Sequence, residues 1–327
     1  GRSYNALERE VMTHTVFIDG EAGTTGLQIL ERLNGRPEIE LIHLGDSQRK
    51  DTAARAGALN TADVSILCLP DDASREAVSL VDTPAARIID ASIAYRTDPD
   101  WIFGFPEWAP GQRDKIAAAT RVTNPGCYAC GSIAILHPLV SAGLVPKNHA
   151  TAINAVSGYS GGGKNLIAAF EDDQAKNTTN SAFYLYGLGL EHKHTEEIRV
   201  HAGLNTRPLF VPSVGRFAQG MIVSVPLHLW ALPGAPSVSD VHAVLTDHYA
   251  SQHFVTVESL ENADAHGAHL DPEGLNGTNH MSLCVFGNEA RQQVVVTAVL
   301  DNLGKGASGQ AVQCLNLMLG FEEETGL

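Results

Sequence analysis

The sequence predicts an α/β fold, in which a Rossmann-type domain with a parallel sheet is followed by an α+β domain with a mostly antiparallel sheet. Three observations predict this. The length of 327 residues is that of two ordinary domains. In the first part of the chain, short and continuously apolar strands alternate with helical segments, as in parallel sheets that helices cover on both faces. After about residue 150 the strands are longer and follow one another without regular helices.

The strands and helices of the first domain are predicted from the spacing of its apolar residues. The predicted elements are strands at 15–19, 39–44, 64–69 and 87–90, with helices at 27–33 and 73–81. Residues 1–11 show no clear period and precede Met12, and we expect them to be a leader ahead of the native start.

The second domain has a different pattern. Its predicted strands are 150–157, 220–229, 280–286 and 293–300, and 240–249 is its predicted helix. A last apolar helix at 309–319 is expected to pack back on the first domain. We therefore assign 12–126 and 303–327 to a cofactor-binding domain, and 127–302 to a second domain.

Composition excludes several classes of protein. Twenty-two basic against 37 acidic residues give a formal charge of −15, which disfavours nucleic acid and anionic lipid as partners. A hydrophobic share of 44% indicates a folded chain, and no apolar run is long enough for a membrane span or placed as in a signal peptide. Five scattered cysteines do not suggest a disulfide framework. These features favour a cytoplasmic protein.

A glycine-rich turn follows the first strand with the spacing G-x-x-G-x-x-G. Such a turn lets the backbone approach a pyrophosphate at a helix N-terminus, although a plain tight turn has the same spacing. Asp46, at the end of the second strand, is followed by basic residues that suit a ribose 2′-phosphate and favour NADP over NAD, unless this is only a solvated basic turn. The candidate cofactor residues are Gly20, Gly23, Thr24, Thr25, Gly26, Ser47 and Arg49.

Cys127 is the candidate nucleophile. The segment 123–128, Thr-Asn-Pro-Gly-Cys-Tyr, is a turn that leads into an apolar helix, so the thiol lies at a helix N-terminus, where the dipole lowers its pKa. A buried structural cysteine is the alternative, and it is our interpretation of Cys68, Cys284 and Cys314. Cys130 gives Cys127 the C-x-x-C redox spacing, but a zinc site would need a second cysteine pair.

Two further clusters carry chemistry. His192 and His194 lie among carboxylates and could form a general base, a metal site completed by Glu191, Glu196 or Glu197, or merely a solvated helix start. We favour proton transfer and expect no metal. The glycine- and serine-rich segment 157–164 is a candidate anion cradle or a flexible loop. Its candidate substrate-binding residues are Ser157, Ser160, Gly161 and Lys164.

Together these motifs resemble the N-acetyl-γ-glutamyl-phosphate reductase family, and its shorter branch most. The matching segments are 17–26, 89–92, 123–128, 157–161, 192–198, 301–307 and 309–313. The resemblance implies NADPH-dependent reduction of an acyl phosphate in arginine biosynthesis, by a catalytic and dimerisation domain that forms a homodimer or homotetramer. It also implies that Cys127 is the nucleophile, that the His-Lys-His segment is the acid/base, and that Asn302, Lys305 and Gly306 lie near the nicotinamide.

Read from the residues, a thiol beside a nicotinamide site suggests that Cys127 captures the acyl group as a thioester, which hydride then reduces to an aldehyde. Three alternatives remain open. Another semialdehyde dehydrogenase, such as the aspartate enzyme, would share the chemistry. A non-catalytic NADP-binding regulator would use Cys127 as a redox sensor. A cysteine hydrolase would need the Cys/His pair but not the glycine loop.

Overall fold

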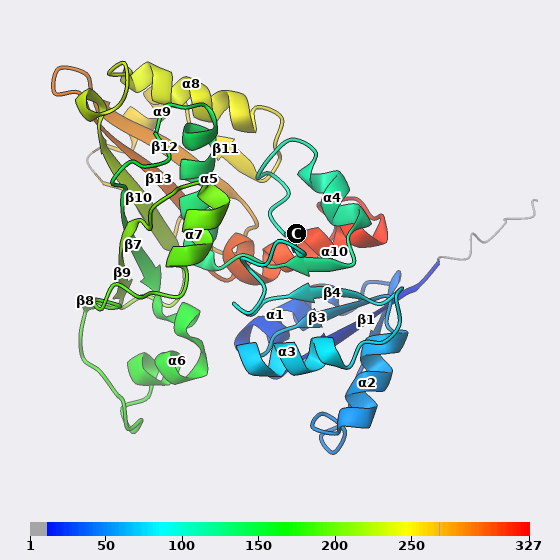
Figure 1. Ribbon diagram of the computed structural model, residues 1–327. Helices are drawn as coiled ribbons and strands as arrows, with labels where there is room; N and C mark the ends of the chain where they lie inside the picture. The colour runs from blue at the N-terminus through cyan, green and yellow to red at the C-terminus, as the bar shows by residue number, and fades with distance from the viewer. Residues whose placement is uncertain (1–11, 268) are drawn as a thin grey trace, which may run out of the picture.

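The computed structural model describes residues 12–267 and 269–327, so the predicted leader at 1–11 lies outside the described residues. It contains two sheets side by side (Figure 1). The first sheet has the order β2-β1-β3-β4-β6-β5, and all its neighbouring strands are parallel. Its strands are β1 (His14–Asp19), β2 (Ile39–Ile42), β3 (Val64–Leu67), β4 (Arg87–Asp90), β5 (Ile102–Phe103) and β6 (Arg121–Thr123).

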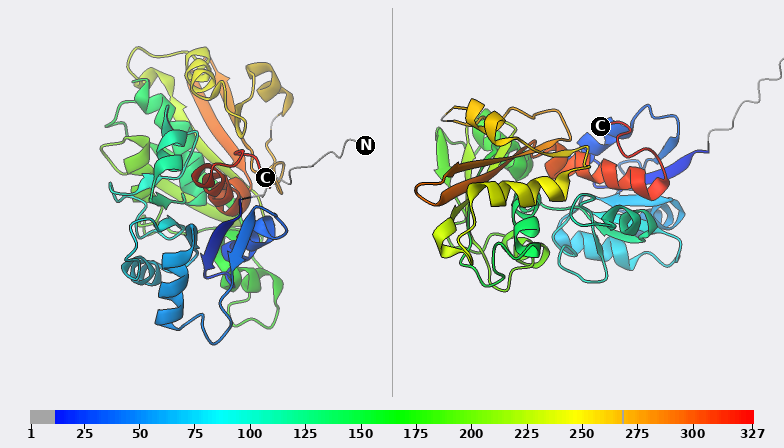
Figure 2. Two further views of the ribbon diagram at one scale, coloured as in Figure 1. Left: turned by 90° about the vertical axis from the view of Figure 1, so that its right-hand side faces the viewer. Right: turned by 90° about the horizontal axis from the view of Figure 1, so that it is seen from above.

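Helices cover both faces of the first sheet. One face packs on α1 (Thr24–Leu33), α4 (Gln112–Ala118) and the C-terminal α10 (Gly309–Leu319). The other packs on α2 (Thr52–Thr61) and α3 (Asp71–Ser79). Figure 2 shows α10 in red at the junction with the second domain, next to the first sheet. The predicted Rossmann-type domain is thus confirmed, and the last helix packs on it.

The second sheet has the order β11-β12-β13-β10-β7-β9-β8, and four of its six strand pairs are antiparallel. Its strands are β7 (Ala152–Gly158), β8 (Phe183–Leu185), β9 (Leu209–Gly215), β10 (Met221–His228), β11 (Val255–Val257), β12 (Met281–Asn288) and β13 (Gln293–Leu300). Its helices are α6 (Gly163–Glu171), α7 (Thr195–Ala202), α8 (Val238–Tyr249) and α9 (Leu260–Ala265), with 3-10 turns η1 (Tyr159–Gly162) and η2 (Leu229–Ala231). The mostly antiparallel α+β domain is confirmed.

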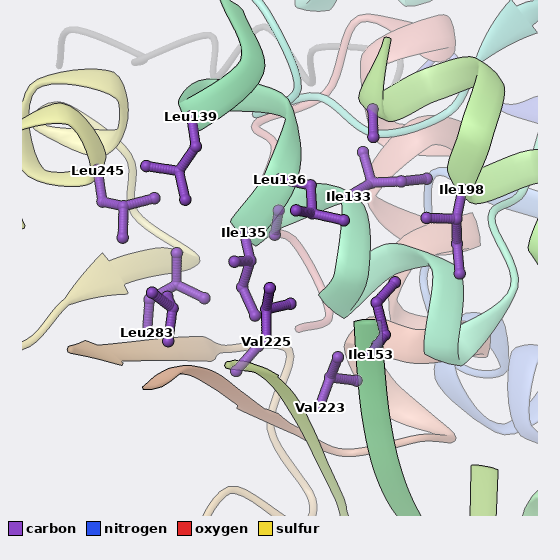
Figure 3. Packing of buried hydrophobic residues seen from close by; sticks show 14 of the residues in the cluster. Ile133, Ile135, Leu136, Leu139, Ile153, Ile198, Val223, Val225, Leu245 and Leu283 are labelled. Carbon is purple, nitrogen blue, oxygen red and sulfur yellow. The ribbon is translucent and has the colours of Figure 1, made fainter. Parts of the chain in front are cut away.

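Helix α5 (Cys127–Ser141) is the centre of the second domain. Twelve of its 15 residues are buried, as expected of a helix that is apolar on every side. Figure 3 shows Ile135 and Leu139 pointing toward the sheet residues Val225 and Leu283 and toward Leu245 of α8. Since α5 directly follows β6 of the first sheet, the chain passes into the second domain at Cys127.

A buried polar cluster joins distant segments of the first domain. Lys305, in the π-helix η3 (Gly304–Ser308), is fully buried and its ammonium lies 2.9 Å from both carboxylate oxygens of Glu107. It also donates to Gln310 and Gln313 of α10 at 2.7 Å. The charge of Lys305 is thus enclosed by protein groups, and its role in binding the cofactor stays a prediction.

We expect Lys305→Met to lower the free energy of unfolding by about 3–5 kcal/mol, because it leaves the Glu107 carboxylate buried without a partner. Urea denaturation measures this change. The double variant Glu107→Gln/Lys305→Met should recover part of the loss, and Lys115→Met, at an exposed position of α4, should change stability by less than about 0.5 kcal/mol. Equal stability of the Lys305 and Lys115 variants would contradict the interpretation.

Among the residues that the structure describes, no helix has both the length and the apolar character that a bilayer crossing requires.

Candidate active site

A cavity of about 550 Å³ lies where the two domains meet. Loops at the carboxyl edge of the first sheet form one wall, and the β7–η1 turn, the segment before α7 and η3 form the other. Parallel strands bring the loops at their carboxyl ends to one edge, which is where α/β sheets bind ligands. The predicted residues in this lining are Thr24, Thr25, Cys127, Ser157, Ser160, Gly161, His192, His194, Asn302 and Gly306.

Two buried charged side chains fix the turn before Cys127. The Gly126 N–H donates to both carboxylate oxygens of Glu197 at 3.1 Å. Arg96 donates from Nε to the carbonyl oxygen of Asn124 at 3.0 Å and forms an ion pair with Glu197 at 3.4 Å. Helix α5 then begins at Cys127, with Gly126 as its extended N-cap. The thiol is thereby held at one point of the cavity wall.

The thiol of Cys127 does not have the lowered pKa that its helix position predicts. Burial raises the pKa of Cys127, although the Tyr128 N–H and the charges of Arg96 and Lys193 act in the opposite direction. The prediction of a dipole-activated thiolate is wrong, because desolvation outweighs the helix N-terminus. A base must therefore remove the proton before the sulfur can attack.

Two histidines that line the same cavity as the thiol differ in how their rings are held. A Cβ on Gly126 would overlap Nε2 of His194, so this nitrogen lies against the residue that precedes Cys127. Burial lowers the pKa of His194 well below its usual value and lowers that of His192 to about 4, so both rings are neutral at neutral pH. The Nδ1 of His192 accepts the His194 N–H at 3.0 Å, which leaves the ring proton on Nε2. In the described chain, Nδ1 of His194 has no hydrogen-bond partner.

The glycine loop fits a dinucleotide. Gly20 has a φ of +86°, which favours glycine, and the turn that begins there leads into α1. A Cβ on Gly26 would overlap the carbonyl oxygen of Gly20, so only glycine allows the helix to start this close to the loop. A second cavity, of about 350 Å³, lies over Gly23 and Gly26.

Lys164 contacts this glycine loop. Its ammonium donates to the carbonyl oxygen of Ala22 at 2.6 Å, and it lines the second cavity together with Gly163 at the start of α6. The structure thus does not bring Lys164 to the cavity wall that contains Cys127. It lies where the N-termini of α1 and α6 both border the second cavity, and its role at the substrate stays a prediction.

A third cavity, also of about 350 Å³, borders Gly20 on the other side of the loop. Arg49 lines it and is ion-paired with Asp46. Ser47 is exposed and does not belong to its lining, whereas Lys50 does. The predicted 2′-phosphate segment therefore lies beside the nucleotide loop, with Arg49 and Lys50 closer to the ligand space than Ser47.

The remaining predicted residues form the wall opposite the glycine loop. The Nδ2 of Asn302 donates to Ser160 Oγ at 3.1 Å, and its Oδ1 accepts the Gly220 N–H at 2.8 Å. Ser157 donates to the carbonyl oxygen of Gly158 at 3.0 Å. A Cβ on Gly306 would lie 2.9 Å from the Cβ of Cys127, so glycine lets η3 pack directly on the nucleophile.

Sequence reasoning missed Arg96 and did not assign Glu197 its observed position. Arg96 follows the strand β4 by a few residues. Its place at the carboxyl edge of a parallel sheet, where such sheets bind ligands, could have identified it as a candidate site residue. Its Nη1 lies 2.8 Å from the position of a Cβ on Gly126, beside His194 and Cys127. Within the described residues, no group of three or more histidine, cysteine or acidic side chains is arranged to hold a metal.

Two family models match the chain. One is described as "Semialdehyde dehydrogenase, NAD binding domain" and matches residues 15–118. The other is described as "Semialdehyde dehydrogenase, dimerisation domain" and matches residues 127–302. The two models place the chain in the semialdehyde dehydrogenase class, and Cys127 lies where the two matched regions meet.

Curated relatives narrow the class. An N-acetyl-γ-glutamyl-phosphate reductase of Burkholderia cenocepacia is 55% identical over 306 residues, which is 94% of this chain and 97% of the relative. N-acetyl-γ-glutamyl-phosphate reductase 2 of Nostoc sp. is 51% identical over 95% of this chain and 98% of its own length, and the reductase of Brucella anthropi is 54% identical over 94% and 99%. The chain belongs to the N-acetyl-γ-glutamyl-phosphate reductase family.

Solved structures with low identity share the fold. Aspartate semialdehyde dehydrogenase of Francisella tularensis has a TM-score of 0.70 at 12% identity, covering 94% of this chain and 100% of that chain. Aspartate semialdehyde dehydrogenase II of Vibrio cholerae, complexed with ASA, has a TM-score of 0.68 at 16% identity over 94% and 98%.

We expect Gly26→Ala to weaken NADPH binding by more than about tenfold, because the added methyl group overlaps the Gly20 carbonyl and opens the loop. Fluorescence titration with NADPH measures this. Gly57→Ala is the matched control, since a Cβ there meets no atom within 4 Å and the residue lies inside α2. Unchanged NADPH affinity in the Gly26 variant would show that the loop does not hold the cofactor.

Proposed function

We propose that this protein reduces N-acetyl-γ-glutamyl phosphate with NADPH to N-acetylglutamate semialdehyde and phosphate in arginine biosynthesis, through a thioester on Cys127. The observation that supports this most is the position of Cys127, at the start of α5 and in the cavity that Thr24 and Thr25 of the nucleotide loop also line. A thiol there can hold an acyl group next to a bound nicotinamide, from which NADPH supplies the hydride.

His194 is the proposed base for the thiol. It is neutral, its Nε2 lies beside Gly126, and no hydrogen bond in the described chain commits its Nδ1. It takes the proton of Cys127 as sulfur attacks the acyl carbonyl, and returns it to the sulfur when the hemithioacetal collapses to the aldehyde. His192, whose ring proton is fixed on Nε2, can only donate and is proposed to bind the carbonyl oxygen.

Arg96 is proposed to bind the leaving phosphate. In the described chain its Nε and Nη2 donate to the carbonyl oxygens of Asn124 and Ala91. Its Nη1 lies beside the residue before Cys127. A guanidinium held so rigidly can donate to a phosphate oxygen without losing further rotational freedom.

The test of the function is NADP⁺- and phosphate-dependent oxidation of N-acetylglutamate semialdehyde, compared with aspartate semialdehyde, followed by NADPH absorbance. We expect a clear preference for the acetylated substrate. Cys127→Ser should lower turnover by more than about 10³-fold, because a hydroxyl is a far poorer nucleophile at neutral pH, while NADPH binding stays unchanged. Preference for aspartate semialdehyde would favour the aspartate enzyme. NADP binding without turnover would favour the regulator, and hydrolysis without NADP the hydrolase.

We expect His194→Asn to reduce turnover by about 10²–10⁴-fold, the usual contribution of a positioned acid/base. His192→Asn should reduce it less, because asparagine can still donate a hydrogen bond. Steady-state kinetics of both variants, with NADPH affinity as the control for folding, decide between the two rings. A larger loss in the His192 variant would reverse the assignment. Inactivation of the wild type by chelation, with recovery on adding zinc, would support a metal site instead.

Lys164 is proposed to bind the pyrophosphate of the cofactor from the second domain, because its ammonium and the start of α6 border the cavity over the glycine loop. Lys164→Met should weaken NADPH binding by about 10-fold or more, since a hydrogen bond to a charged group contributes about 1.5–3 kcal/mol. Binding of adenosine 2′-monophosphate, which has no pyrophosphate, should not change. Lys176→Met, also exposed in this domain, is the control. Equal losses for both nucleotides would refute the assignment.

We further propose that the chain assembles as a homodimer or homotetramer in the cytoplasm, with 12–126 plus 303–327 and 127–302 as its domains. Exposed apolar side chains on and near β8 support an interface in the second domain; they are Phe183, Leu185, Leu188, Leu190 and Leu209. All five cysteines are free thiols, as expected of a reducing compartment.

A further inference from the structure

Cys127 and Cys130 lie on one face of the first turn of α5. Cα atoms three residues apart in an α-helix are separated by about 5 Å, within the roughly 4.4–6.8 Å of disulfide-bonded cysteines. The two side chains also face the same neighbouring segment. A Cβ on Gly306 would touch the Cβ of Cys127, and Gln310, one helical turn later, donates from Nε2 to the sulfur of Cys130 at 3.6 Å.

The two thiols differ in access and in role. Cys127 is half-buried and lines the cavity, whereas Cys130 is fully buried directly behind it. The proposed reduction uses Cys127 and leaves Cys130 without a function. Cys130 is also not an ordinary core cysteine, because Gln310 links its sulfur to the buried ammonium of Lys305.

The first turn of a helix can adjust more easily than its middle. Its first N–H groups have no intrahelical partner, and the turn at Cys127 is closed by the bond from the Cys130 N–H to the Gly126 carbonyl oxygen at 2.8 Å. Gly126, before the pair, packs against His194 and Arg96, and Gly131, after it, packs against Val223, so any adjustment falls within the turn between these two glycines.

We propose that Cys127 and Cys130 form a reversible disulfide when the enzyme meets a peroxide. His194 takes the thiol proton as the Cys127 sulfur attacks one oxygen of hydrogen peroxide and becomes a sulfenic acid, and the other oxygen leaves as water once His194 has passed that proton to it. The sulfur of Cys130 then attacks the Cys127 sulfur and displaces the hydroxyl, which leaves as a second water with the Cys130 proton. Two thiols are oxidised by two electrons and one peroxide is reduced. The disulfide keeps the nucleophile from irreversible oxidation to sulfinic acid.

The proposal rests on the proposed function only in taking Cys127 as the reactive thiol and His194 as its base, and its first readout is independent of catalysis. Reduced full-length protein is treated with hydrogen peroxide and its mass is measured. We expect a species about 2 Da lighter and a peptide pair that joins Cys127 to Cys130. A product heavier by whole oxygen atoms, with no such peptide pair, would overturn the proposal whether or not the chain reduces an acyl phosphate.

The second readout is recovery. Dithiothreitol should restore most of the activity of the peroxide-treated wild type. If no turnover is found, the readout is instead the recovery of Cys127 alkylation by iodoacetamide. Cys130→Ser should have normal basal activity, should gain oxygen on Cys127, and should recover at least about tenfold less after the same treatment. Cys284→Ser, in β12, is the matched control and should behave as wild type. Equal recovery of the Cys130 and Cys284 variants would also overturn the proposal. If the Cys130 variant does not fold, the wild-type mass decides alone.

Discussion

The ion pair between Lys305 and Glu107 holds together the parts on which the site depends. A buried charge is tolerated only when partners surround it, and here they come from three segments: the loop after β5, the π-helix η3 and helix α10. The same π-helix places Gly306 against Cys127. The glutamate keeps its charge, since Lys305 holds the pKa of Glu107 below its usual value against the cost of burial. The position of η3, and with it one wall of the cavity, is therefore set by electrostatics in the core.

The protonation of Cys127 depends on whether the helix N-terminus or burial has the larger effect on the pKa of its thiol. A helix N-terminus stabilises a negative charge by about 0.3–1 kcal/mol, which is less than one pKa unit at about 1.4 kcal/mol per unit. Burial can shift the pKa of a fully buried group by up to about 3–5 units, and the partial burial of Cys127 raises the pKa of its thiol. A buried nucleophile of this kind stays protonated until a substrate and a base are both present. The neutral His194 beside it is such a base, so activation of sulfur and capture of the acyl group are expected to occur together.

What the sequence could predict was local. The glycine spacing, the strand-to-helix alternation and the turn that ends at Cys127 are all contained in a few consecutive residues, and the structure places them as expected. The positions of Lys164 and Lys305 could not be predicted for the same physical reason: each is decided by a partner far along the chain. Lys164 reaches Ala22 across 142 positions, and Lys305 reaches Glu107 across 198. Arg96 was missed because its neighbours, Asn124 and Glu197, become adjacent only when the sheet edge and α7 meet.

The location of the nucleophile also explains why the two domains must be fixed relative to each other. Cys127 is the first residue of a helix that packs in the core of the second domain, but the turn before it directly follows β6 of the first sheet. Hydride transfer requires a set distance between the thioester and a cofactor held by the first domain, whereas proton transfer requires a set distance to His194 in the second. Two contacts tie the domains at this point: Arg96 with Glu197, and Lys164 with the glycine loop. The first of them is buried. Lys164 is exposed, and its bond to the Ala22 carbonyl is the one that a bound pyrophosphate could replace, so the cofactor itself would complete the connection between the domains.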